Sequence, residues 1–264
     1  MGKKITFPTI SLGSEPDNPE KSDVISFVSK HRGEEADLIT CLLSASVQPQ
    51  KKAGITQICS GGLFYNERFD CRFREDDDIL SFLTNGEIQE TIQQDARHCI
   101  HEAKRSAFAL AGPSHVRAFE EISGADWADD CFSFYRSARR TMRDAGIQRH
   151  VIHDACTDSD ITEGLMGSKV LLFPDCSTIP VLENLLEFQK TVTVTNEEFR
   201  LIPPLLERYE IKKIILIRPA PETISCVLEH YDPDAIVVGG YRTQDSLSAE
   251  KYWEEVIADA SYSG

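Results

Sequence analysis

The chain has 264 residues, of which 41% are hydrophobic, enough for a buried core and for one large domain or two small ones. It carries 28 basic and 43 acidic residues, a net charge of -15, so we expect neither a nucleic-acid partner nor an anionic membrane surface. No apolar run reaches about 18 residues, and the N-terminal segment lacks a signal peptide's apolar core, so no membrane segment is predicted.

The cysteines indicate the redox environment. Eight are present, mostly inside apolar runs and without a C-x-x-C pair, as is typical of buried free thiols. We therefore expect a reducing, cytoplasmic location. Gly2 fits the N-myristoylation pattern together with Thr6, but this short pattern does not decide whether Gly2 is acylated.

The first half of the chain predicts strands followed by a helical region. Candidate strands cover residues 4–10, 36–44 and 54–60. Residues 66–78 lack apolar periodicity and are interpreted as a polar loop and candidate lid.

The helical region begins with a capping box formed by Thr84 and Glu87. The next stop signal is the Gly112-Pro113 pair, so we predict one long helix between them. Two more helices are expected at residues 114–122 and 126–145.

The second half repeats a strand and then a helix, with strands at 149–154, 169–175, 190–195, 212–219 and 234–240. Helix-start signals support this pattern. Thr195 and Glu198 form a capping box, Ser177 is a candidate N-cap, and Pro221 occupies a position expected in a first turn.

This alternation predicts an α/β fold with a parallel sheet. We expect a single α/β domain over residues 1–264, with 63–146 as a loop-plus-helical insertion and 147–264 as a regular βα-repeat half. The length and strand number also fit a β/α barrel, a fold of about 250 residues. We favour an open doubly wound sheet because no convincing strand lies between Ser60 and Gln148.

Polar residues follow the strands of the second half, where ligands of parallel α/β folds bind. Asp154 and Asp175 are the candidate catalytic acid/base residues. Together with Asp158 they are also candidate ligands for a divalent cation such as Mg²⁺ or Mn²⁺. His150 and His153 are three residues apart on an extended run, so they point to opposite faces and should not share one metal ion.

Arg218 and Arg242 are expected to bind the carboxylate or phosphate of a small anionic metabolite, which suits the planar guanidinium fork. The other candidate substrate-binding residues are small or polar: Ser177, Thr178, Asn196, Gly239, Gly240 and Tyr241. We therefore predict a small-molecule enzyme, a hydrolase, lyase or transferase, with metal assistance as one option.

A second hypothesis makes Cys59 a catalytic nucleophile. The small residues Ser60, Gly61 and Gly62 follow it, as a tight nucleophile turn requires. In this the segment resembles the cysteine elbow of glutamine amidotransferases, which implies a hydrolase or amidotransferase. A buried strand-end thiol is the competing interpretation.

A third hypothesis is a non-catalytic ligand-sensing or partner-binding domain. It rests on a basic stripe at helical spacing, formed by Arg136, Arg139, Arg140 and Arg143. Simple charge balance is the alternative. The sequence contains no dinucleotide, P-loop, zincin or serine-hydrolase motif that would name a reaction.

Overall fold

The computed structural model describes residues 4–32, 36–70, 86–116, 119, 127–245 and 247–263. Its strands form two parallel four-stranded sheets and one short antiparallel pair. The strands are β1 (Lys4–Thr6), β2 (Thr9–Ser14), β3 (Cys59–Gly61), β4 (Ala107–Ala111), β5 (His150–Asp154), β6 (Val170–Pro174), β7 (Thr191–Val194), β8 (Lys213–Ile217), β9 (Ile236–Arg242) and β10 (Ser261–Ser263).

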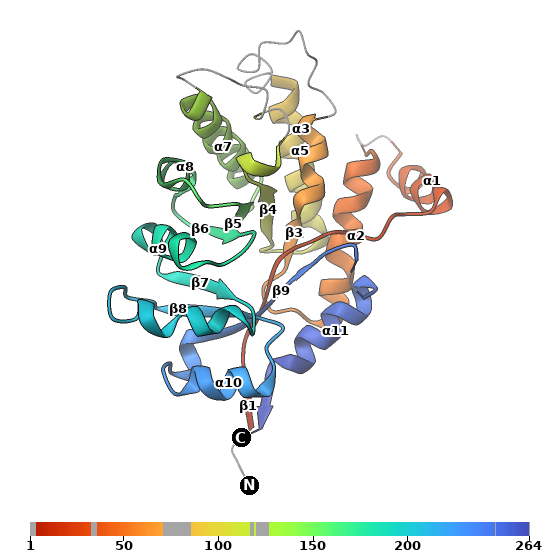
Figure 1. Cartoon of the computed structure of the whole chain (residues 1–264). Coiled ribbons are helices and arrows are strands. Elements are labelled where there is room, and N and C mark those ends of the chain that lie inside the picture. The colour runs from red at the N-terminus through yellow and green to blue at the C-terminus, as the bar shows by residue number, and fades with distance from the viewer. Residues whose placement is uncertain are drawn as a thin grey trace.

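Helices lie around these strands (Figure 1). The α-helices are α1 (Lys21–Lys30), α2 (Leu38–Ala53), α3 (Glu67–Asp70), α5 (Gly86–Glu102), α7 (Trp127–Asp144), α8 (Ser159–Leu165), α9 (Ile179–Phe188), α10 (Pro221–Leu228) and α11 (Ala249–Asp259). Short 3-10 turns are η1 (Leu63–Asn66), η2 (Pro113–His115), η3 (Glu198–Leu201), η4 (Pro203–Leu205) and η5 (Pro233–Ala235). Among the described residues, none of these helices combines the length and apolar character needed to cross a bilayer.

The two sheets, ordered β3-β4-β5-β6 and β2-β9-β8-β7, meet along both edges. On one side the Ser11 N–H donates to the carbonyl of Gln57 at 2.9 Å, which places β2 beside the segment entering β3. On the other side the Gln189 side chain bonds the backbone of Leu172 in β6 and the carbonyl of Thr191 in β7. The strands therefore follow one another from β2 to β9, which pairs again with β2.

The predicted α/β fold with parallel strands is confirmed, and its strand order is that of a β/α barrel. The favoured doubly wound order is not found, because no strand reversal interrupts the sequential order. β4 accounts for the difference, since it lies within residues 63–146, where the sequence predicted no strand. Its Ala- and Leu-rich residues favour helices, and burial on both faces removes the polar alternation that marks a strand.

Two other predicted elements are wrong. The long helix ends at Glu102 as α5 and does not continue to residue 112. The strand expected at 36–44 is the start of α2. Asp37 and Thr40 form a reciprocal capping box there, and Gly54 ends the helix with a left-handed φ of 86°. The predicted capping residue Thr84, the lid residues 71–78 and most of the predicted helix 114–122 lie outside the described residues.

Three hydrophobic clusters fill the molecule. A small cluster lies inside the barrel and includes Leu12, Cys59, Ala109 and Val151. Two larger clusters pack the outer faces of the strands against the helices. At the end of the molecule where both termini lie, β1 pairs with β10 (Figure 1). The carboxyl ends of the barrel strands remain as the place to look for a site.

Candidate functional site

Three side chains converge at the carboxyl ends of successive strands. His115 lies in η2 directly after β4, His153 lies in β5, and Asp175 follows β6. The His115 Nε2 atom is 2.7 Å from Asp175 Oδ1, and the His153 Nε2 atom is 3.1 Å from the same oxygen. One ligand atom from each residue lies within 4.8 Å of the others. We call this group the His115–His153–Asp175 cluster.

The surroundings hold His153 in place. Its ring stacks on Phe173 with centroids 4.6 Å apart and meets the edge of Tyr241 at 4.8 Å. The Tyr241 hydroxyl donates to Glu15 at 2.6 Å and accepts from the Leu63 N–H at 3.1 Å. Tyr241, in β9, thus packs against the His153 ring of the cluster. Its hydroxyl also connects the ends of β2 and β9 to the turn after β3.

Hydrogen bonding sets the charge of the cluster. The bond to Asp175 raises the pKa of His115, against the opposing effect of partial burial. Partial burial opposes the change in Asp175 as well, but the bonds from His115 and His153 hold the pKa of that carboxyl well below its usual range. Asp175 is therefore a carboxylate, and it faces two imidazoles.

The donor set fits a divalent transition metal ion. Two imidazole nitrogens and one carboxylate oxygen form a three-ligand site of the kind that leaves a position open for water or substrate. Two of the three separations, 2.7 Å and 3.1 Å, lie close to the distance of about 3.3 Å between neighbouring ligands of a tetrahedral zinc ion. The buried Nδ1 atom of His153 has no hydrogen-bond partner among the described residues, so this nitrogen remains available for a ligand or a supporting contact.

The predicted all-aspartate metal site is not assembled. Asp154 is buried and accepts hydrogen bonds from the N–H and hydroxyl of Ser114 and from the Cys156 N–H, so it anchors the turn that carries His115. Asp158 caps α8 by accepting the N–H groups of residues 160 and 161. Of the three, Asp175 alone joins the cluster. His150 is not a member of the cluster.

The two arginines expected to bind one anion do not converge. The Arg218 side chain forms ion pairs with Glu255 and Asp259 on α11. The Arg242 guanidinium is buried, where it pairs with Asp17 and donates to the backbone carbonyls of Glu15 and Leu247. Both arginines hold loops and helices together.

The remaining predicted binding residues mostly have local partners. The Ser177 N–H donates to Glu198, while Thr178, and not Ser177, provides the N-cap of α9. Asn196 bonds the backbone of residues 218 and 220. A Cβ atom on Gly239 would lie 2.6 Å from Ile215, and one on Gly240 would lie 3.0 Å from the Tyr252 hydroxyl. Both glycines therefore allow neighbouring side chains to pack closely, and no contact among the described residues indicates a role in ligand binding.

Cys59 is a core residue and does not have the properties of a nucleophile. The side chain is fully buried inside the barrel, and its Sγ atom lies 3.6 Å from the carbonyl oxygen of Ser60. Burial raises the pKa of the Cys59 thiol far above its usual range. A nucleophilic cysteine needs an accessible thiolate, so the geometry contradicts the catalytic role of Cys59.

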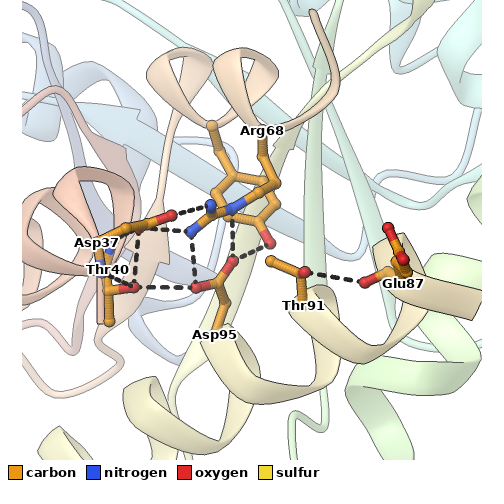
Figure 2. Close-up of polar contacts among 7 residues, drawn as sticks. Asp37, Thr40, Arg68, Glu87, Thr91 and Asp95 are labelled. Carbon is orange, nitrogen blue, oxygen red and sulfur yellow. Dashed lines mark hydrogen bonds and ion pairs between the residues drawn. The ribbon is translucent and has the colours of Figure 1, made fainter. Parts of the chain in front are cut away.

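A second group of charges lies between the helices (Figure 2). Arg68 is buried and bonds both oxygens of Asp37 and both oxygens of Asp95. The Tyr65 hydroxyl donates to Asp95 at 2.9 Å, and Thr40 bonds Asp37 at 3.1 Å. We call this group the Asp37–Arg68–Asp95 network. It connects the N-terminus of α2 with α3 and α5.

Sequence reasoning missed His115 and set His153 aside. His115 follows β4, which was assigned to a helix, so it did not enter the set of strand-end residues. The Gly112-Pro113 pair before it was a usable signal, since it ends a strand as readily as a helix. As a metal ligand, His153 was considered only together with His150, its neighbour in sequence, whereas its partners come from the adjacent strands.

The chain matches no protein-family model, and no curated protein matches its sequence. It is similar in fold to a methyltransferase from Methanosarcina mazei, with a TM-score of 0.60, 11% identity, and coverage of 97% of this chain and 93% of that chain. It is also similar to a B12-independent methionine synthase from Shewanella sp. W3-18-1 in complex with selenomethionine, with a TM-score of 0.51, 12% identity, and coverage of 97% and 96%. At these identities the likeness establishes the α/β fold.

Proposed function

We propose that the protein is a cytoplasmic small-molecule enzyme whose reaction centre is the His115–His153–Asp175 cluster, holding a divalent transition metal ion. The observation that carries this proposal is the convergence of three ligand atoms within 4.8 Å at the barrel end where such folds bind substrates. A bound ion would act as a Lewis acid and lower the pKa of a coordinated water or thiol.

The chain's own residues define the rest of the centre. Asp175 is the side chain that both histidines contact, and Phe173 and Tyr241 fix the plane of the His153 ring. Two imidazole nitrogens and one carboxylate oxygen favour Zn²⁺, a borderline ion, over the hard ion Mg²⁺. Because a methyltransferase and a methionine synthase share the fold, methyl transfer is the first reaction class to test.

A metal-free acid/base centre is the second candidate, and one observation favours it. Asp175 Oδ1 is within hydrogen-bond distance of both imidazoles, and its bond to His115 raises the pKa of that histidine. In this case His115 would act as the acid or base and Asp175 would orient its ring. A metal requirement separates the two candidates.

Turnover tests the proposal. Wild-type protein with added Zn²⁺ or Mn²⁺ is incubated with a metabolite extract supplemented with methyl donors and thiols, and consumed compounds are identified by mass spectrometry. We expect Asp175→Asn to abolish the consumption. Asp158→Asn is the matched control, because asparagine preserves the α8 cap and Asp158 lies outside the cluster. Equal turnover by all three proteins would overturn the proposal, and metal-independent turnover lost only in Asp175→Asn would support the acid/base centre.

A further inference from the structure

A groove of about 770 Å³ lies beside α7 and α8, on the outer side of the barrel strands. His150 and Val170, the first residues of β5 and β6, are among its lining residues. His150 shares a strand face with Ile152, which packs in the helix-facing core, whereas His153 shares a face with Val151 inside the barrel. The groove is therefore distinct from the His115–His153–Asp175 cluster.

Four arginines of α7 line this groove, namely Arg136, Arg139, Arg140 and Arg143. Their spacing of three and four residues places them on one face of the helix. In a chain with a net charge of -15, this is a local concentration of positive charge. None of the four forms an ion pair with a carboxylate among the described residues.

Arg139 is the most informative of the four. Its residue surface is only 6% exposed. It donates from Nε to the carbonyl of Tyr135 at 3.1 Å and from Nη1 to the carbonyl of Leu165 at 2.7 Å, which uses two of its five N–H groups. Burial lowers the pKa of Arg139, and Arg143 and Arg136 lower it further. A buried cation without a countercharge is costly, so an anion in the groove would stabilise it.

His150 provides a second, independent observation. The residue is 2% exposed, and its Nε2 atom has no hydrogen-bond partner among the described residues. Burial, together with Arg139 and Arg143, lowers the pKa of His150 to about 3, so the imidazole is neutral near pH 7. A neutral imidazole nitrogen that carries its hydrogen can donate to an anionic oxygen.

The shape and charge of the groove indicate which kind of ligand it would bind. A Cβ atom on Gly167 would lie 3.1 Å from Arg139 Nη1, so this glycine allows the backbone to lie close to the guanidinium. Asp160 and Glu163 also line the groove and offset two of the four positive charges. The remaining charge matches a dianion, while Phe132 and Met166 supply apolar surface for an attached organic group.

We propose that this groove binds a small molecule carrying a dianionic phosphate group, which contacts Arg139, Arg140 and Arg143 together with the Nε2 atom of His150. Planar guanidinium groups suit phosphate oxygens, and three of them provide more charge-assisted hydrogen bonds than one surface arginine can. The ligand of this groove is separate from the substrate of the proposed reaction centre. A negative result at either site therefore leaves the proposal for the other site unaffected.

Calorimetric titration tests this site with two probes, inorganic phosphate and phenyl phosphate, in low salt and with EDTA present so that no metal site contributes. The test variant is Arg140→Gln/Arg143→Gln, since both side chains are exposed. The matched control is Arg97→Gln/Arg200→Gln, which removes two exposed arginines that do not line the groove. Melting curves confirm that each variant is folded.

We expect one phosphate-probe site per chain, weakened at least about tenfold in the test variant and unchanged in the control. The His150 imidazole resonances should shift on binding, because the proposed phosphate group contacts the Nε2 atom. An anion held by the exposed arginines alone would leave these resonances unchanged. Tighter binding of phenyl phosphate would support an organic ester, and equal binding would identify inorganic phosphate itself as a sufficient ligand. The proposal is overturned if neither probe saturates the protein by roughly 10 mM, or if both variants lose affinity equally.

Discussion

The Asp37–Arg68–Asp95 network and the His115–His153–Asp175 cluster both combine carboxylates with nitrogen bases, but they differ in what is left to bind. In the network Arg68 and Asp95 are buried, with side chains 4% and 3% exposed, and the guanidinium bonds both carboxylates (Figure 2). In the cluster the Asp175 side chain is 34% exposed and the donors meet at the barrel end. Internally satisfied charges hold helices together, whereas converging donors with access to solvent are suited to a ligand.

Breaking the network should give the largest loss of stability. Arg68→Met leaves Asp95 buried without its countercharge, so we expect the free energy of unfolding to fall by about 3 to 5 kcal/mol. Arg208→Met is the control, because Arg208 is 62% exposed in its ion pair with Glu183, and it should cost about 1 kcal/mol or less. Urea denaturation measures both. Equal losses would show that Arg68 is no more important than a surface ion pair.

The pH dependence of stability should identify which carboxyl of the network takes up a proton. Burial, only partly offset by Arg68 and Tyr65, raises the pKa of Asp95 from 3.8 to about 6. The folded state then binds more protons than the unfolded state between these values, so this group should add about 1 kcal/mol of stability as the pH falls from 7 to 5.

The titration of Asp37 does not contribute to the change in stability between pH 7 and 5. Partial burial opposes the change, but bonds from Arg68 and the Thr40 N–H lower the pKa of Asp37 to about 2, so its contribution is lost only as the pH falls through that value. Asp95→Asn removes the titration of Asp95 and keeps its shape. Melting curves of wild type and Asp95→Asn should therefore diverge between pH 7 and 5, and parallel curves would contradict the assignment.

A smaller effect is expected at Arg218. Its partly exposed ion pairs with Glu255 and Asp259 join the end of β8 to α11, so Arg218→Gln should cost less than about 1 kcal/mol. Thermal unfolding measures this cost, and calorimetry compares ligand binding by the two proteins. Weaker binding of a substrate with an unchanged melting temperature would restore the anion-binding role predicted from sequence.

Cys59 should show no reaction at all. Iodoacetamide near neutral pH should label the exposed Cys176 and Cys226 first and leave the buried Cys59 unmodified in the folded protein. Peptide mass spectrometry locates the labels. Fast, selective modification of Cys59 would revive the nucleophile hypothesis.

Sequence patterns predicted the regular half of the fold and part of the site. The strands from β5 to β9 were found because their Val- and Ile-rich runs alternate with helical segments. β4 was missed because an Ala-rich strand buried on both faces carries no periodic signal, and that error concealed His115. Asp175 was identified from its place after a strand, but its partners depend on strand pairing, which sequence spacing does not encode.

Zn²⁺ binding is the most direct test of the His115–His153–Asp175 cluster as a metal site. Isothermal titration of the metal-free protein with Zn²⁺ at neutral pH should show one tight site per chain, weakened at least about a hundredfold in Asp175→Asn and unchanged in Asp158→Asn. Zn²⁺ affinity that is the same in Asp175→Asn as in wild type, or that falls in Asp158→Asn alone, would contradict the assignment of the His115–His153–Asp175 cluster as the metal site.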